Sequence, residues 1–180
     1  MGMPGIFFDE GRTIMDLKGK VHKFGDDVNT DYIISGRHKF KTLDMKELAK
    51  YVMEDLDPDF YSKVSKGDFI VGGRNFGCGS SREQAPLAII NADIDAVIAK
   101  SFARIFYRNC INTGLALIEC DTDQIDEGDE LEINLQAGIL YNRTKGIEIQ
   151  ITPLPEVMLK ILSEGGLVEH FKKYGTFNFD

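Results

Sequence analysis

The chain has 180 residues, 43% of them hydrophobic and 28% charged, which is the balance expected of one globular domain with its own hydrophobic core. Its 21 basic and 29 acidic residues give a net charge of -8, which argues against nucleic acid as a partner, because phosphate backbones bind clustered Lys and Arg. No apolar run reaches the ~20 residues that cross a bilayer, and residues 1–11 lack the cationic and apolar regions of a secretory signal. We therefore expect a cytoplasmic protein with no membrane partner.

The three cysteines are Cys78, Cys110 and Cys120, an odd number with wide gaps. This spacing fits neither a disulfide framework nor a compact metal knuckle, and it favours a reducing compartment. Cys110 and Cys120 stand in apolar segments, so we expect core packing for them rather than metal ligation. An iron–sulfur cluster held by the three thiolates of this chain remains an alternative.

Residues 1–16 are interpreted as a tag or flexible N-terminus, and residues 17–180 as one domain. The first half of that domain alternates apolar strands with a polar turn and an amphipathic helix, which ends before Asp57-Pro58. The patterning predicts a strand over 17–24, a turn over 25–31, a flexible basic loop over 36–41 and a helix over 43–56.

The middle of the chain alternates buried-type strands with helices, which indicates an α/β fold. The predicted elements are strands over 68–72, 96–99 and 115–118 and helices over 80–92 and 103–112. Hairpin-like strands and two closing helices follow. They are predicted over 130–135 and 138–151, with a turn at 142–146, and over 154–163 and 167–173. One compact α/β domain with a mixed sheet accounts for all of these elements.

A glycine-rich segment leads from the strand over 68–72 into the predicted helix, where Ser80, Ser81 and Arg82 follow Gly77 and Gly79. Glycines allow close backbone approach, and a loop that enters a helix presents free amides and the positive end of the helix dipole. Arg82 adds a forked donor suited to a carboxylate. The segment therefore predicts a site for a small polyanion, with Ser80 or Ser81 as helix cap. A tight turn with a helix cap is the purely structural alternative.

Known phosphate and nucleophile motifs do not describe this segment. It has no closing Gly-Lys-Ser/Thr, no third glycine of a dinucleotide fingerprint and no Gly-x-Ser-x-Gly. None of the three histidines has a context that ties it to Ser80, so a Ser-His-Asp hydrolase is disfavoured.

Three segments carry a family resemblance. Residues 77–84 (GCGSSREQ) resemble the signature of the mobile swivel domain of the aconitase superfamily, and residues 99–109 and 27–33 resemble two further signatures of that domain. Their order, the chain length and the lack of a cluster-binding domain are similar to the free-standing small subunits of the isopropylmalate isomerase family. The resemblance implies a swivel-type β/β/α domain, with a mixed sheet or barrel flanked by helices.

The resemblance also implies a function. It is that of the small subunit of a heteromeric hydro-lyase that interconverts 2-isopropylmalate and 3-isopropylmalate by dehydration and rehydration, in leucine biosynthesis. A [4Fe–4S] cluster is expected on the partner large subunit and none on this chain. Ser80 is expected to act as the base, and Asp31 as a second catalytic residue; an Asx-type turn is the alternative for Asp31.

The residues expected to bind the substrate are Arg82, Ser81, Gly79, Lys41 and Arg37, with a simple helix cap as the alternative for Ser81. Arg104 and Arg108 are expected to serve the fold or the subunit contact.

Residues 35–42 correspond to the loop that distinguishes substrates in this family. Phe40 suits an apolar substituent, whereas Arg37, Lys39 and Lys41 suit a second carboxylate or a solvated loop. The substrate is therefore expected to be a substituted malate. A homoaconitase or dimethylmalate dehydratase small subunit is the alternative within the family, and a non-catalytic anion-binding module is the alternative from another class.

Overall fold

The computed structural model describes residues 16–39 and 41–179. The interpretation of residues 1–16 as a tag or flexible N-terminus falls outside this range except for Asp16, which begins the first strand. The elements in chain order are β1 (Asp16–Lys23), α1 (Thr30–Ile33), α2 (Gly36–Lys39), α3 (Met45–Ala49), α4 (Phe60–Lys63), β2 (Asp68–Val71), α5 (Gln84–Asn91), β3 (Ile94–Ala99), α6 (Arg104–Thr113), β4 (Ala116–Glu119), the 3-10 turn η1 (Thr122–Gln124), β5 (Glu130–Asn134), β6 (Ile139–Asn142), β7 (Ile147–Gln150), α7 (Glu156–Ser163) and α8 (Leu167–Tyr174).

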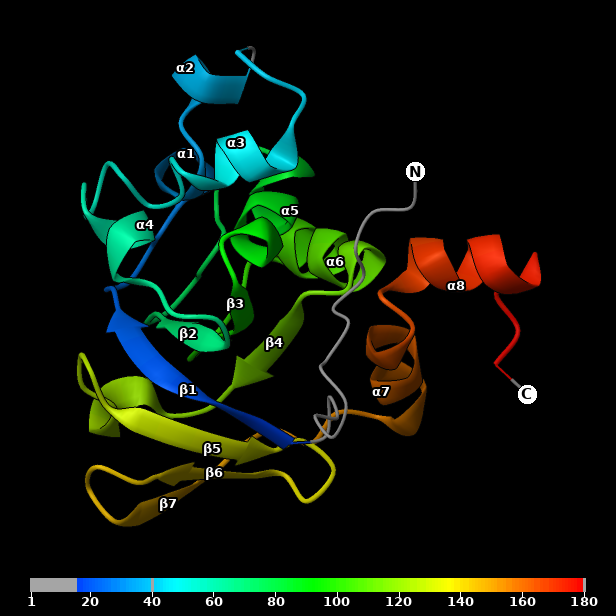
Figure 1. Cartoon of the computed structure of the whole chain (residues 1–180). Coiled ribbons are helices and arrows are strands. Elements are labelled where there is room, and N and C mark those ends of the chain that lie inside the picture. The colour runs from blue at the N-terminus through cyan, green and yellow to red at the C-terminus, as the bar shows by residue number, and fades with distance from the viewer. Residues whose placement is uncertain (1–15, 40, 180) are drawn as a thin grey trace.

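One curled, seven-stranded sheet in the order β4-β3-β2-β1-β5-β6-β7 organises the chain (Figure 1). Strands β1 to β4 are parallel, and β5 to β7 continue the sheet in antiparallel pairs. Strand β1 joins the two parts, because it pairs in parallel with β2 and antiparallel with β5. The predicted α/β class with a mixed sheet is confirmed.

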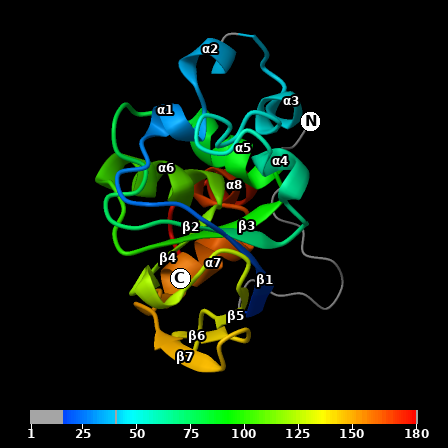
Figure 2. The same cartoon turned by 90° about the vertical axis from the view of Figure 1, so that its left-hand side faces the viewer.

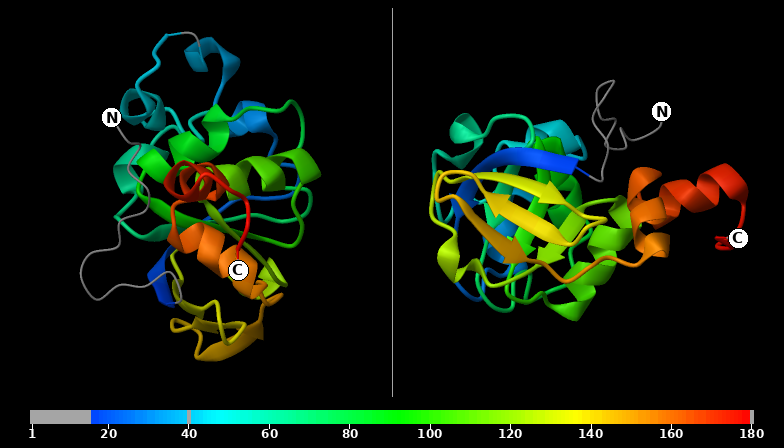
Figure 3. Two further views of the ribbon diagram at one scale, coloured as in Figure 1. Left: turned by 90° about the vertical axis from the view of Figure 1, so that its right-hand side faces the viewer. Right: turned by 90° about the horizontal axis from the view of Figure 1, so that it is seen from below.

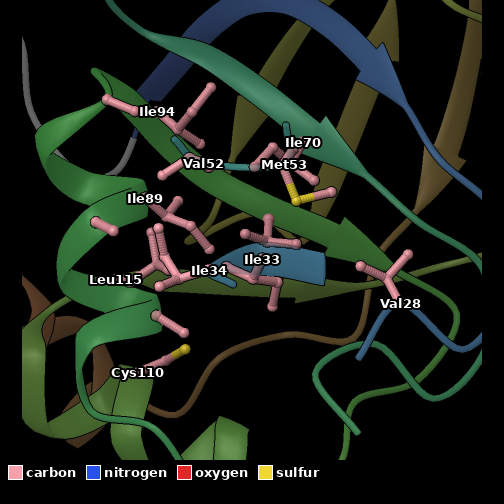
Figure 4. Packing of buried hydrophobic residues seen from close by; sticks show 14 of the residues in the cluster. Val28, Ile33, Ile34, Val52, Met53, Ile70, Ile89, Ile94, Cys110 and Leu115 are labelled. Atoms are coloured by element: carbon pink, nitrogen blue, oxygen red, sulfur yellow. The ribbon is translucent and has the colours of Figure 1, made fainter. Parts of the chain in front are cut away.

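Strands β2 and β3 are buried along their whole length, because each face of the parallel part is covered. Ile70 points into a core with α1, α3, α5 and α6, where Figure 4 shows it near Ile33 and Ile89. Phe69 and Val71 point to the other core, against β5, β6, β7 and α7. Figure 2 shows α1 to α6 above the parallel strands and the antiparallel strands below them. The continuous apolar runs of these strands follow from burial on both faces.

The helix predicted over 43–56 is shorter, since α3 ends at Ala49 and a series of turns follows. Met53 has a φ of 60°, outside the helical region, and its amide donates to Ile33 O at 3.0 Å. This tertiary bond anchors the end of α1 and takes the chain out of the helix. The basic loop predicted over 36–41 also differs, because residues 36–39 form the short helix α2.

The C-terminal helices α7 and α8 leave the sheet beside α6, and α8 extends outward (Figure 3). The close approach depends on Gly114, which ends α6 in the left-handed region at φ 87°. A Cβ there would lie 2.5 Å from the backbone of Gly165. Gly175 ends α8 in the same region at φ 68°, but a Cβ on Gly175 would have open space within 4 Å.

We expect Gly114→Ala to lower the free energy of unfolding by about 3 kcal/mol, because the left-handed strain adds to a clash with backbone that cannot move aside. Gly175→Ala, the matched control, introduces only the backbone strain and is expected to cost about 1 kcal/mol. Urea unfolding of both variants measures the difference. Equal losses would show that the contact between α6 and the α7–α8 turn is not tight.

Candidate active site

The candidate site lies where the parallel strands β1, β2 and β3 end. The carboxyl ends of parallel strands share one edge of a sheet, and ligands of open α/β sheets bind there. The loops that follow the strands continue side by side, with parallel bridges between Asn29 and Cys78 and between Phe76 and Phe102. The three segments that carry the family resemblance, distant in sequence, therefore form one continuous surface.

Glycine is required at the centre of this surface. Gly77 has a φ of 83°, and a Cβ on it would lie 2.2 Å from Cγ of Phe106. Its amide donates to Val28 O at 2.7 Å. Gly79 has a φ of 95° and lies against Thr30, whose Oγ1 donates to Ser80 O at 2.8 Å. The turn thus fixes the backbone from which the serine pair projects.

Ser80 and Ser81 line a pocket of about 120 Å³ together with the first turn of α6. Its other lining residues are Thr30, Gly77, Gly79, Arg82, Ala103, Arg104, Ile105, Phe106 and Asn109. Ala103, the N-cap residue of α6, provides no side-chain cap, so the helix offers amides and the positive end of its dipole at this place. The pocket therefore combines hydroxyl groups, a guanidinium and a helix N-terminus, a set of groups that stabilises anions.

The prediction of a helix over 80–92 capped by Ser80 or Ser81 is wrong at its start. The helix α5 begins at Gln84 with Glu83 as its N-cap residue, and Ser80 and Ser81 lie in irregular backbone. Pro86 gives the reason, because a helix that began at Ser80 would place a proline ring against the carbonyl four residues earlier. The helix N-terminus at the serine pair is that of α6, and Pro86 is the sequence signal that indicates the later start of α5.

Arg82 is held in place by two groups from the loop after β1. Its Nη1 donates to Ile34 O at 2.7 Å, and its Nη2 forms an ion pair with Asp31. The Arg82 side chain is 13% exposed, and the Asp31 side chain is 62% exposed. Asp31 lies in the first turn of α1, with Asn29 as the residue that caps it. The structure thus brings together Asp31, Ser80, Ser81, Gly79 and Arg82, which the sequence predicted as site residues.

Arg37 and Lys41 lie apart from this pocket's lining. The Arg37 guanidinium contacts Glu54 at 3.0 Å and also binds Asp55, so it ties α2 to the turns after α3. Although burial raises the pKa of Glu54, the hydrogen bonds from Arg37 and His38 hold it below its usual value. Lys41 is exposed. Phe40, the residue predicted to favour an apolar substituent, lies outside the described residues, as does the side chain of Lys39.

Arg104 and Asn109, both on α6, line the pocket with polar side chains but were not among the predicted site residues. Arg104, expected to serve the fold or a subunit contact, is exposed and lines the pocket as the first residue of α6. Asn109 is buried and donates from Nδ2 to Ser81 Oγ at 3.2 Å. The sequence carried one indication of such residues, which was the place of their helix in the chain. A helix that follows a parallel strand after a short loop presents its first turn to the site.

The three cysteines lie in different parts of the fold. Cys110 is fully buried and Cys120 packs beside the second core, as predicted. Burial raises the pKa of the Cys110 thiol well above its usual range and, with Asp121 nearby, raises the pKa of Cys120 to about 12. Within residues 16–39 and 41–179, no three His, Cys, Asp or Glu side chains converge as a metal-binding group. Cys110 and Cys120 belong to separate cores, an arrangement unlike the converging thiolates that hold an iron–sulfur cluster.

Comparison with known proteins identifies the family to which this fold and site belong. Residues 29–123 match the aconitase C-terminal domain family. The chain is 62% identical over 161 residues to "3-isopropylmalate dehydratase small subunit 2" of Archaeoglobus fulgidus, covering 89% of this chain and 98% of that protein. It is 54% identical to the corresponding small subunit of Methanosarcina mazei over 87% of this chain and 97% of that protein. A crystal structure of 3-isopropylmalate dehydratase from Methanocaldococcus jannaschii matches with a TM-score of 0.86 and 50% identity, covering 89% of this chain and 96% of that one.

The residues matched by the family, 29–123, include the glycine-rich loop, the serine pair and Arg82. The chain belongs to the aconitase C-terminal domain family and, within it, to the family of 3-isopropylmalate dehydratase small subunits. The family predicted from the three sequence segments is confirmed. No helix in the described part of the chain is long and apolar enough to cross a membrane.

The raised thiol pKa values predict slow alkylation of the folded protein. Because Cys120 is neutral below a pKa of about 12, its reaction with iodoacetamide should rise about tenfold per pH unit from pH 7 to pH 10 without reaching a plateau. Cys78 is partly exposed and should react first, and fully buried Cys110 last. Timed alkylation followed by mass spectrometry measures the three rates, with the guanidinium-unfolded chain as control. A plateau near pH 8.5 for Cys120 in the folded protein would contradict this burial.

Proposed function

We propose that this chain is the small subunit of a heteromeric hydro-lyase that interconverts 2-isopropylmalate and 3-isopropylmalate, the reaction of leucine biosynthesis that its relatives are named for. The observation that carries the proposal is the pocket in which Ser80 lies among the glycine turn, Arg82 and the N-terminus of α6. The high identity to named small subunits over nearly their whole length supports it. We place the reaction in the cytoplasm, in keeping with three cysteines that form no disulfide.

The proposal requires a large subunit. Iron–sulfur chemistry is general in the aconitase family, and the cysteines of this chain lie in different parts of the fold, so we assign the [4Fe–4S] cluster to that partner. When bound there, the cluster supplies a Lewis acid for the hydroxyl group and one carboxylate of the substrate. Asp31 and Ser80 are exposed in the isolated chain, which suits residues that meet a substrate held partly by another subunit.

Ser80 is the proposed base. A serine hydroxyl is a weak acid, so its alkoxide needs a positive environment. The first turn of α6 and the guanidinium of Arg82 line the same pocket and supply that environment. Ser80 Oγ, as the alkoxide, takes the proton from the carbon beside the hydroxyl-bearing carbon, and the electron pair of that carbon–hydrogen bond forms the double bond. The carbon–oxygen bond breaks, and the hydroxyl group leaves as water after taking a proton from solvent, which gives an unsaturated acid. Rehydration reverses these transfers, with the hydroxyl and the returned proton exchanged between the two carbons.

Arg82, Ser81 and Gly79 are the proposed substrate-binding residues around this base. The guanidinium of Arg82 presents a fork that fits a carboxylate, and its bonds to Ile34 O and Asp31 fix its direction beforehand. Asp31 is proposed to act in catalysis beside it. Asp31 already compensates the charge of Arg82 through their ion pair. A substrate carboxylate bound to Arg82 would therefore share this cation with Asp31.

The proposed substrate carries an apolar substituent. The positive charge of Arg37 is engaged by Glu54 and Asp55, which leaves little of it for a second distal carboxylate. Lys41 is exposed and is proposed, with Arg37, to face the substrate from the loop over 35–42. A substrate with three carboxylates, as for a homoaconitase, would require Arg37 to give up its two carboxylate partners.

Replacement of the base tests the reaction. With the large subunit present, Ser80→Ala should lower kcat for 3-isopropylmalate by about 10²- to 10⁴-fold, the range of general-base catalysis. Ser62→Ala, an exposed serine on α4, is the matched control and should keep the wild-type rate. Dehydration is followed by the absorbance of the unsaturated acid. A Ser80→Ala enzyme with full activity would refute the base assignment.

Substrate choice gives a second test. The complex should turn over isopropylmalate with a higher kcat/KM than homocitrate or 2,3-dimethylmalate.

Arg37→Gln should change KM by no more than about fivefold, because the guanidinium is held in surface ion pairs, and the loss of these pairs should lower Tm. Lys41→Gln should raise KM on the order of 3- to 10-fold through weaker attraction of the dianion. Preference for homocitrate would change the assignment to a homoaconitase. Tight binding of malates by this chain alone, without turnover in the complex, would favour an anion-binding module.

A further inference from the structure

The segment over 99–109 matches a family signature, yet the proposed reaction assigns no task to its last residue. Asn109 lies on α6, is 8% exposed and lines the pocket of the serine pair. Its Nδ2 donates to Ser81 Oγ at 3.2 Å, a bond between residues 28 positions apart. It is a buried polar side chain directed at an exposed hydroxyl of the site, which calls for an explanation by function.

We propose that Asn109 is a positioning residue that sets the direction of the Ser81 hydroxyl proton, and thereby makes Ser81 a hydrogen-bond donor toward the Ser80 alkoxide. The inference rests on the proposed function, in which Ser80 Oγ carries negative charge. Asn109 would give the hydrogen bond from Ser81 to Ser80 a fixed direction. It acts only through Ser81 and does not touch the substrate.

The direction follows from the chemistry of the amide. The Nδ2 group of an asparagine donates and does not accept, so Ser81 Oγ must accept in this bond. A hydroxyl that accepts from one side keeps its own proton for another partner. Ser80 and Ser81 are adjacent and line one pocket, so the proton of Ser81 is available to the oxyanion there. A neutral donor aimed at developing negative charge is a recurring device of active sites.

The frame around Asn109 is rigid enough to set this direction. Thr113 Oγ1 donates to Asn109 O at 2.8 Å, one turn further along α6. Phe106, one turn earlier on the same helix, packs against Gly77 of the glycine turn so closely that a Cβ there would overlap its ring. Helix α6 therefore fixes the glycine turn through Phe106 and the serine pair through Asn109.

Three variants in the complete enzyme test the proposal. Asn109→Asp keeps the shape of the side chain but replaces the donor with an acceptor, so Ser81 would turn its proton toward residue 109. We expect kcat to fall about 30-fold with KM changed less than threefold, because the loss concerns the charged transition state. Asn109→Ala removes the donor without burying a charge and should lower kcat about fivefold. Asn112→Asp makes the same exchange one turn later on α6, away from Ser81, and should leave kcat unchanged.

A double-mutant cycle separates positioning from simple support of the fold. On a Ser81→Ala background, Asn109→Asp should lower kcat by less than twofold, since the hydroxyl it misdirects is absent. Equal losses from Asn109→Asp with and without Ser81 would overturn the proposal, and so would an Asn109→Asp enzyme with at least half of wild-type kcat. If Asn109→Asp does not fold, as judged by its thermal transition, the same cycle with Asn109→Ala decides. An inactive wild-type complex would instead refute the proposed function, and the inference would fall with it.

Discussion

The site depends on the parallel pairing of β1, β2 and β3 and on its continuation past the ends of the strands. Parallel strands deliver their loops to one edge, and here the loops stay paired through the bridges from Asn29 to Cys78 and from Phe76 to Phe102. Gly77 makes the continuation possible, because a side chain there would overlap the ring of Phe106. The catalytic candidates thus inherit the rigidity of the sheet although none of them lies within a strand.

Positive potential at the pocket has two sources that come from different parts of the fold. The first is the uncapped N-terminus of α6, which the β3–α6 connection places beside Ser80. The second is Arg82, which is held by Ile34 O and Asp31 from the loop after β1. In a protein with a net charge of -8, it is this local arrangement rather than the overall charge that would attract the proposed substrate, a substituted malate. Ser80, which lines the pocket, and Asp31, which pairs with Arg82 beside it, are both exposed, in agreement with the proposed sharing of the site between two chains.

Helix α2 is held by interactions of another kind. Arg37 binds Glu54 and Asp55, and His38 stacks on Tyr51 with 3.9 Å between ring centroids, so α2 rests on the turns after α3. These contacts are more local and more polar than the core under the glycine turn. A loop held in this way can change between relatives without disturbing the catalytic edge, which suits a role in choosing the substituent of the substrate.

The sequence by itself determined the strand and helix alternation, the α/β class and the family, because buried strands and glycine turns leave strong local patterns. It also brought Asp31, Ser80, Ser81 and Arg82 into one site through family resemblance. It did not predict the end of α3, where an amide bond from Met53 to Ile33 O overrides helical periodicity. Nor did it predict the pocket roles of Asn109 and the first turn of α6. Only tertiary structure decides these features, since they depend on which groups meet across loops distant in sequence, and periodicity carries no record of such contacts.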